Sequence, residues 1–246
     1  MATLNTTAGY RRLDTWVMAN IIQLGTDIFC EKFLIRKLDP TGRQYDQMTQ
    51  AARSGKANIV EGSARAGTSK ETEMRLTDVA KASLDELSSD YEKWLLRKRL
   101  APWHRDTVEA KEILNIRLDK PHYGTDWMHD SCIHVLNQQK KFEKWFLSDD
   151  DVVMANCLLI LIMRCIFMLS KQISAQVNEF EQDGGFKEKL TQIRVEAKMQ
   201  KTDAPACPIC GCGMYLRKAT SGKNAGREFW GCSNYPECKG IVNKNE

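Results

Sequence analysis

One stretch decides the fold class of this chain: Val152-Val-Met-Ala-Asn-Cys-Leu-Leu-Ile-Leu-Ile-Met-Arg-Cys-Ile-Phe-Met-Leu169, which is apolar on nearly every helical face. Its length would allow it to cross a membrane, but Arg164 within it would cost about 2.5–3.5 kcal/mol near the bilayer centre. Asn156 adds a second polar group, and Asp149-Asp-Asp151 precedes the stretch where an aromatic belt is expected. Helices that are apolar all round are usually buried among other helices. We therefore expect a core helix of a helical bundle and no membrane insertion.

Helical periodicity extends through most of the chain before residue 183. It predicts helices over about 10–38, 44–66, 68–100 and 150–180, shorter helices within 103–147, and a last charged helix over 186–201. The predicted stripe of the first helix is Leu13, Val17, Ile21, Leu24 and Ile28, and that of the third is Leu76, Val79, Ala80, Ser83, Leu84, Leu87, Tyr91 and Leu95. Thr68-Ser-Lys-Glu71 has the spacing of a capping box that starts the third helix. Long helices joined by short turns predict an up-down four-helix bundle, with a helical insert at about 101–147.

Four cysteines near the end of the chain predict a metal site: Cys207-Pro-Ile-Cys210 and Cys232-Ser-Asn-Tyr-Pro-Glu-Cys238. Each pair can form a tight turn that presents two thiolates, and four convergent thiolates suit a structural Zn²⁺ ion. The spacing favours Cys210 as a ligand, although Cys212 lies two residues away and could replace it.

The segments 214–219 and 227–232, between and beside these pairs, have the patterns of two strands joined by a turn. The sequence thus predicts a mainly α protein that ends in a small β zinc ribbon. We expect a helical domain over 1–200, a linker at 201–206 and the ribbon over 207–246. The ribbon has few apolar residues, so zinc binding and folding should be a single event.

A disulfide interpretation of these cysteines competes with zinc. The N-terminal Met-Ala-Thr-Leu-Asn-Thr-Thr lacks the basic start and the apolar run of a signal peptide. Most of the other five cysteines lie in apolar helical patterns, where a free thiol packs as a small hydrophobe: Cys30, Cys132, Cys157, Cys165 and Cys212. This usage fits a reducing compartment, so we expect zinc and a cytoplasmic protein.

Most of the net positive charge lies near the C-terminus. The chain has 36 Lys and Arg against 32 Asp and Glu, and residues 201–246 contribute seven of the former and four of the latter. Basic side chains that track phosphates, beside aromatic rings that stack on bases, are typical of single-strand binding surfaces. The candidate contacts are Arg217, Lys218, Arg227, Phe229, Trp230, Tyr235 and Lys239. Strand alternation places Phe229 and Trp230 on opposite faces, and we expect one in the ribbon core and the other exposed.

The cysteine motifs resemble a known module. Cys207-Pro-Ile-Cys210-Gly, followed by Phe229-Trp-Gly-Cys-Ser-Asn-Tyr-Pro-Glu-Cys-Lys-Gly240, resembles the C-terminal zinc ribbons of bacterial type IA DNA topoisomerases. The resemblance implies a topoisomerase-type zinc finger that binds single-stranded DNA without cleaving it. It covers about the last forty residues, and the rest of the chain is too short for that enzyme.

The helical region carries a second resemblance. Asn58-Ile-Val-Glu-Gly62, Ser69-Lys-Glu71 and Ala80-Lys-Ala-Ser-Leu-Asp-Glu-Leu87 resemble the four-helix-bundle proteins encoded in intervening sequences of bacterial 23S rRNA genes, whose superfamily includes the accessory protein of diversity-generating retroelements. A bundle followed by this ribbon also resembles the "four helix bundle suffix domain" proteins. The resemblance implies a homopentamer and binding to nucleic acid or a reverse transcriptase, although the insert at 101–147 departs from the family pattern. We expect Asn58 and Glu61 to hydrogen-bond between helices and Gly62 to allow close packing.

Little in the sequence indicates an enzyme. Neither a Gly-rich phosphate loop nor a nucleophile elbow is present. Arg99-Leu-Ala-Pro-Trp-His104 has the Arg-x4-His spacing of the helical HEPN ribonucleases, although Leu100 replaces the polar residue usual after that Arg. A second metal site from His129, Cys132 and His134 matches no standard ligand spacing.

The sequence therefore predicts a non-enzymatic, oligomeric adaptor that contacts single-stranded DNA or RNA through its ribbon. Two alternatives stay open: a protein-interaction scaffold whose ribbon docks a partner, and a HEPN-like ribonuclease that uses Arg99 and His104.

Overall fold

The computed structural model describes residues 9–35, 38–183, 204–220 and 225–243. The chain forms two compact units, Met1–Gly185 and Phe186–Glu246, where the sequence places the domain boundary between 200 and 207. The predicted helix over 186–201 and residues 201–203 of the predicted linker lie outside the described residues.

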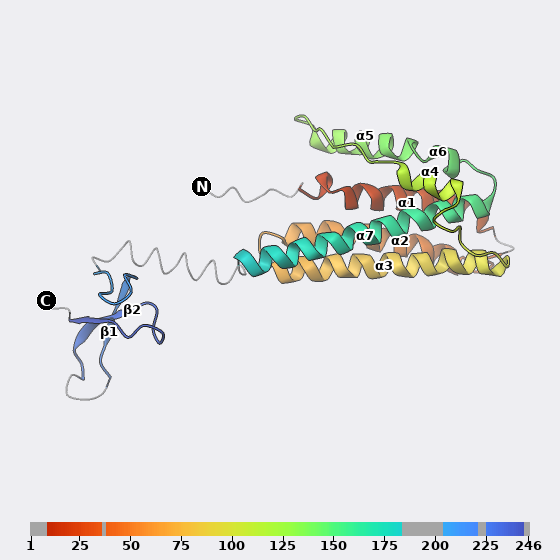
Figure 1. The fold of residues 1–246 in the computed structure, drawn as a ribbon. Coiled ribbons are helices and arrows are strands. Elements are labelled where there is room, and N and C mark those ends of the chain that lie inside the picture. The colour runs from red at the N-terminus through yellow and green to blue at the C-terminus, as the bar shows by residue number, and fades with distance from the viewer. Residues whose placement is uncertain (1–8, 36–37, 184–203, 221–224, 244–246) are drawn as a thin grey trace. The chain divides into compact units, whose positions relative to one another are not determined.

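The first unit is helical, as predicted (Figure 1). Its long helices are α1 (Asp14–Phe33), α2 (Arg43–Arg65), α3 (Lys70–Arg97) and α7 (Asp151–Asp183), and a 3-10 turn, η1 (Gly9–Arg12), precedes α1. α1 packs against α2 and α7, and α3 packs against the same two helices. The insert forms α4 (Val108–Asn115), α5 (Trp127–Lys140) and α6 (Glu143–Phe146), which contact α1 or α7. Helices in the insert were therefore predicted correctly.

Most residues of the two predicted apolar stripes are buried in the core or pack at its edge. Val17 and Ile21 of α1 are buried, and Leu13, Leu24 and Ile28 pack against the core at its edge. In α3, the prediction fails for Val79, which is exposed. α7 runs beside α3 (Figure 1). Most of the apolar residues in its 152–169 stretch are buried in the core.

Two polar groups of α7 attach the insert. Arg164 donates from Nη1 to the Ile113 carbonyl at 3.0 Å and from Nη2 to the Ile116 carbonyl at 2.7 Å. Asn156 accepts a hydrogen bond from the Trp103 backbone N–H at 2.7 Å. Within the described residues, α7 is the one helix long and apolar enough to cross a membrane, and 61% of its most apolar window is buried inside the protein. Most of this apolar window is therefore covered by the rest of the helical unit.

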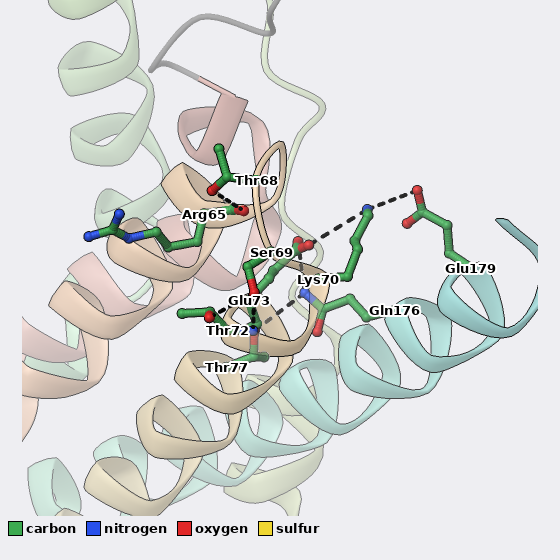
Figure 2. Close-up of polar contacts among 9 residues, drawn as sticks. All are labelled: Arg65, Thr68, Ser69, Lys70, Thr72, Glu73, Thr77, Gln176 and Glu179. Atoms are coloured by element: carbon green, nitrogen blue, oxygen red, sulfur yellow. Dashed lines mark hydrogen bonds and ion pairs between the residues drawn. The ribbon is translucent and has the colours of Figure 1, made fainter. Parts of the chain in front are cut away.

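The start of α3 differs from the predicted capping box (Figure 2). Ser69 is the N-cap residue, and its Oγ accepts a hydrogen bond from the Thr72 backbone N–H at 3.2 Å. Thr68 instead donates to the Arg65 carbonyl at the end of α2, also at 3.2 Å, and Glu71 is exposed. The predicted N-cap was wrong by one residue, because the Thr68 hydroxyl forms its hydrogen bond with the last turn of α2.

Polar side chains then tie this end of α3 to α7 (Figure 2). Gln176 donates to Glu73 Oε1 at 3.0 Å and to Thr77 Oγ1 at 3.3 Å. Lys70 forms an ion pair of 2.9 Å with Glu179. These contacts fix the packing of α7 on the first two turns of α3.

The Asn58–Gly62 motif agrees only in part with its predicted role. Glu61 is exposed, and Asn58 donates to the Ser54 carbonyl and hydroxyl within its own helix, so neither forms the predicted interhelical bond. Gly62 is buried against α3, where an added Cβ would lie 3.3 Å from the Glu73 carbonyl oxygen. Close packing at Gly62 is therefore confirmed.

Candidate metal centre and exposed ribbon face

The second unit contains a three-stranded antiparallel sheet in the order β1 (Met214–Lys218), β2 (Glu228–Cys232), β3 (Ile241–Asn243). The first two strands were predicted. The third was missed because Ile241-Val-Asn243 is too short for an alternating pattern to be recognised.

The structure brings the four predicted cysteines together. The Sγ atoms of Cys207, Cys210, Cys232 and Cys238 all lie within 4.8 Å of one another. The Cys207–Cys238 pair is 3.7 Å apart and the Cys210–Cys232 pair 3.4 Å. Tetrahedral coordination with metal–sulfur bonds of about 2.3 Å places sulfur atoms about 3.8 Å apart. The cluster therefore has the donor set and the spacing to hold a metal ion.

Backbone turns position the two cysteine pairs. Gly211 adopts φ +73°, and its N–H donates to the Cys207 carbonyl at 2.9 Å, which closes the first turn. In the second loop the Asn234 N–H donates to Cys232 Sγ at 3.3 Å. Hydrogen bonds from backbone N–H groups orient thiolate ligands and stabilise their charge.

The Cys210 and Cys238 thiols differ in acidity. The backbone N–H of Cys212 and the neighbouring thiols lower the pKa of Cys210 to about 6. A hydrogen bond at Gly240 acts to lower the pKa of Cys238, but the Cys210 thiolate and burial outweigh it and raise that pKa to about 12. Four thiolates this close repel one another, so their joint ionisation requires a cation among them.

Gly240 makes the cluster sterically possible, and sequence reasoning missed it. A Cβ at this position would lie 2.2 Å from Cys207 Sγ and 3.7 Å from Cys238 Sγ. Its carbonyl also accepts a hydrogen bond from the Cys232 N–H at 2.9 Å. The Lys239-Gly240 dipeptide after the last cysteine was the available signal.

The remaining cysteines lie outside the cluster. Cys212 is exposed, whereas Cys30, Cys157 and Cys165 are buried in the helical unit. Burial raises the pKa of Cys30 and of Cys165 to about 12, which keeps these thiols protonated. Every cysteine in the chain is described, and none forms a disulfide.

Strand register separates the two faces of the sheet. Trp230 pairs with Leu216 and Val242, and it packs with Val242 on the buried cysteines and Met214. Phe229 pairs with Arg217 and therefore lies on the opposite face. The predicted division of the two rings between faces is correct, although both rings are half-buried.

The face that carries Phe229, here called the Phe229 face, combines aromatic and basic groups. Tyr215 and Arg217 of β1 belong to it by alternation, with Ile241 of β3. The Arg217 guanidinium lies 5.5 Å from the centre of the Tyr235 ring, which is 59% exposed. Three residues of the predicted contact set thus lie together: Arg217, Phe229 and Tyr235.

The other predicted contacts are elsewhere on the ribbon. Lys218 alternates to the core face, opposite Glu228 on the neighbouring strand. Arg227 and Lys239 are exposed, just before β2 and just after Cys238. Tyr215 was absent from the predicted set, although its position two residues before Arg217 was the signal for a shared face.

The residues of the other sequence hypotheses lie in the helical unit. Arg99 follows α3 with φ +60°, and His104 is exposed, with Nδ1 3.5 Å from the Asp106 carboxylate. Among the described residues, the four-cysteine cluster is the one group of His, Cys, Asp or Glu close enough to hold a metal, so His129, Cys132 and His134 do not converge.

Comparison with protein-family models, with curated proteins and with solved structures gave no match in any of the three. The metal cluster and the Phe229 face therefore provide the evidence on which a function can be argued.

Proposed function

We propose that this protein is a non-enzymatic nucleic-acid-binding adaptor whose ribbon holds one Zn²⁺ ion and contacts single strands. Zinc is the metal that fits best, because four thiolates at tetrahedral spacing are its usual structural ligands. Four cysteines with Sγ atoms within 4.8 Å support this choice. Metal analysis of the purified chain should give one zinc per chain, and a chelator should remove it with loss of ribbon structure.

The Phe229 face carries the proposal for nucleic acid. Stacking of a base on an aromatic side chain contributes about 1–3 kcal/mol and tolerates any base. Tyr235 and Phe229 provide rings on this face, and Arg217 lies beside Tyr235 as a cation for a phosphate. Phe229 and Arg217 lie on the face of the sheet opposite to Trp230 and the buried cysteines, and Tyr235 lies in the loop between Cys232 and Cys238.

The helical unit is proposed to be an up-down four-helix bundle that self-associates. α1, α2, α3 and α7 contact one another in a closed ring, which supports the bundle. Self-association would strengthen weak ribbon contacts by raising their effective concentration. Little of the 152–169 stretch is available for this contact, because most of it is already buried within the chain.

Fluorescence anisotropy of labelled single-stranded DNA and RNA tests the binding surface. Phe229→Ala should weaken binding by about tenfold, which corresponds to about 1.4 kcal/mol of stacking. Arg217→Gln should also make the slope of log K against log salt concentration less steep, by the amount expected for the loss of about one phosphate contact.

Lys218→Gln is the matched control, because it removes one adjacent charge from the other face of the same strand. It should change binding far less than Arg217→Gln does. Equal losses for the two variants would show that only net charge matters. Unchanged binding after deletion of residues 202–246 would refute the role of the ribbon.

A further inference from the structure

The helical unit has a groove of about 920 Å³ that the proposed function does not use. It lies among α3, α4, α7 and the segment that links α3 to α4. Its apolar lining includes Leu114 from α4 and four residues of α7: Leu159, Ile160, Met163 and Phe167. This volume is within the range of about 300–1,000 Å³ that is usual for small-molecule sites.

Part of the apolar lining faces solvent. Phe167 is 63% exposed, Met163 is 55% exposed and Leu114 is 37% exposed. Met163 and Phe167 lie on the outer side of α7, whose other apolar residues fill the core, and Leu114 belongs to α4. Large apolar groups gathered around a concave surface usually mark a binding site.

The same groove is positively charged. Arg105, Arg117 and Arg164 line it, and Glu92 is its one acidic lining residue. Within the described part of the chain, none of these arginines forms an ion pair with a carboxylate. Arg164 uses two of its five N–H donors on backbone carbonyls. The groove therefore presents unneutralised guanidinium groups beside an apolar surface.

The pKa of Arg164 agrees with a positively charged groove. Burial lowers the pKa of its guanidinium, and the positive charge of Arg117 lowers it further. Two like charges near each other in a partly desolvated groove favour an anion between them.

Charge also argues against two other occupants. A second copy placed by two-fold symmetry would bring the same arginines face to face. Residues 184–201 of this chain carry five Lys or Arg against two Asp or Glu, so that segment has the wrong sign.

We propose that this groove is a binding site for a small amphipathic anion, a carboxylate on an unbranched aliphatic tail. The carboxylate accepts hydrogen bonds from Arg117 and from the remaining N–H groups of Arg164. The tail lies against Met163 and Phe167 and buries their exposed apolar surface.

Isothermal titration calorimetry on the full chain tests this site with three unbranched ten-carbon probes: decanoate, decylamine and 1-decanol, each below its aggregation concentration. Decanoate should bind at least tenfold more tightly than the other two, because only it pairs with the arginines. Equal affinity for all three, or no binding of decanoate, would overturn the proposal.

Two variants distinguish the contacts of the ligand's carboxylate from those of its aliphatic tail. Arg117→Gln should weaken decanoate about tenfold and leave 1-decanol unchanged, whereas Phe167→Ala should weaken both. Both side chains are largely exposed, so neither change should unfold the protein. Arg75→Gln, an exposed arginine of α3 outside the groove lining, is the charge-matched control and should have no effect. If Arg117→Gln bound decanoate with wild-type affinity, the proposed contact between Arg117 and the carboxylate would be contradicted.

Discussion

Replacement of Gly240 by alanine tests the geometry of the metal centre most directly. The added methyl group would lie 2.2 Å from Cys207 Sγ, whereas optimal non-bonded contacts are about 3.5–4 Å. The backbone of Gly240 has no positive φ, so alanine adds steric conflict without backbone strain. Relief of the conflict requires the sulfur or the chain to move by more than about 1 Å.

The expected cost follows from two effects. Overpacking of a well-packed site costs about 1–3 kcal/mol. Metal sites also require ligand distances within about 0.2 Å of their usual values, so a displaced Cys207 would bind the metal poorly. We therefore expect zinc affinity to fall by about tenfold to more than a hundredfold, since each 1.4 kcal/mol is a factor of ten.

Competition of the full chain against a colorimetric zinc chelator measures this change. Gly67→Ala is the matched control, because the space around Gly67 is open and its φ is ordinary. That variant should bind zinc as the wild type does. If Gly240→Ala also retained wild-type affinity, the close approach of residue 240 to Cys207 would be refuted.

Two further predictions concern the helical unit. Arg164→Leu removes both hydrogen bonds to the carbonyls of Ile113 and Ile116, and it should lower the free energy of unfolding by about 2–4 kcal/mol. Chemical denaturation measures this, with the exposed Arg75→Leu as the control that should change little. Ser69→Ala should cost about 1 kcal/mol because it removes the N-cap of α3. Glu71→Ala should leave the free energy of unfolding nearly unchanged in the same experiment. A larger loss of stability for Glu71→Ala than for Ser69→Ala would support the capping box of Thr68 and Glu71 instead.

Local patterns predicted the elements but not always their ends. The predicted stripe of α3 identified its buried face, yet Val79 is exposed because neighbouring helices do not cover the edge of that stripe. The capping box was placed one residue early because the Thr68 hydroxyl has two possible partners, and only the path of α2 decides between them.

Residue chemistry and spacing along the chain determined the helical class and the four-cysteine cluster, because helix periodicity and cysteine turns are local properties. The tertiary structure alone decided what depends on distant contacts. Arg164 meets carbonyls about fifty residues away, and Gly240 approaches Cys207 from a different loop. Strand register placed Phe229 beside Arg217 and turned Trp230 toward the cysteines. Sequence could not give these outcomes, because register and close approach depend on how separate segments pack together.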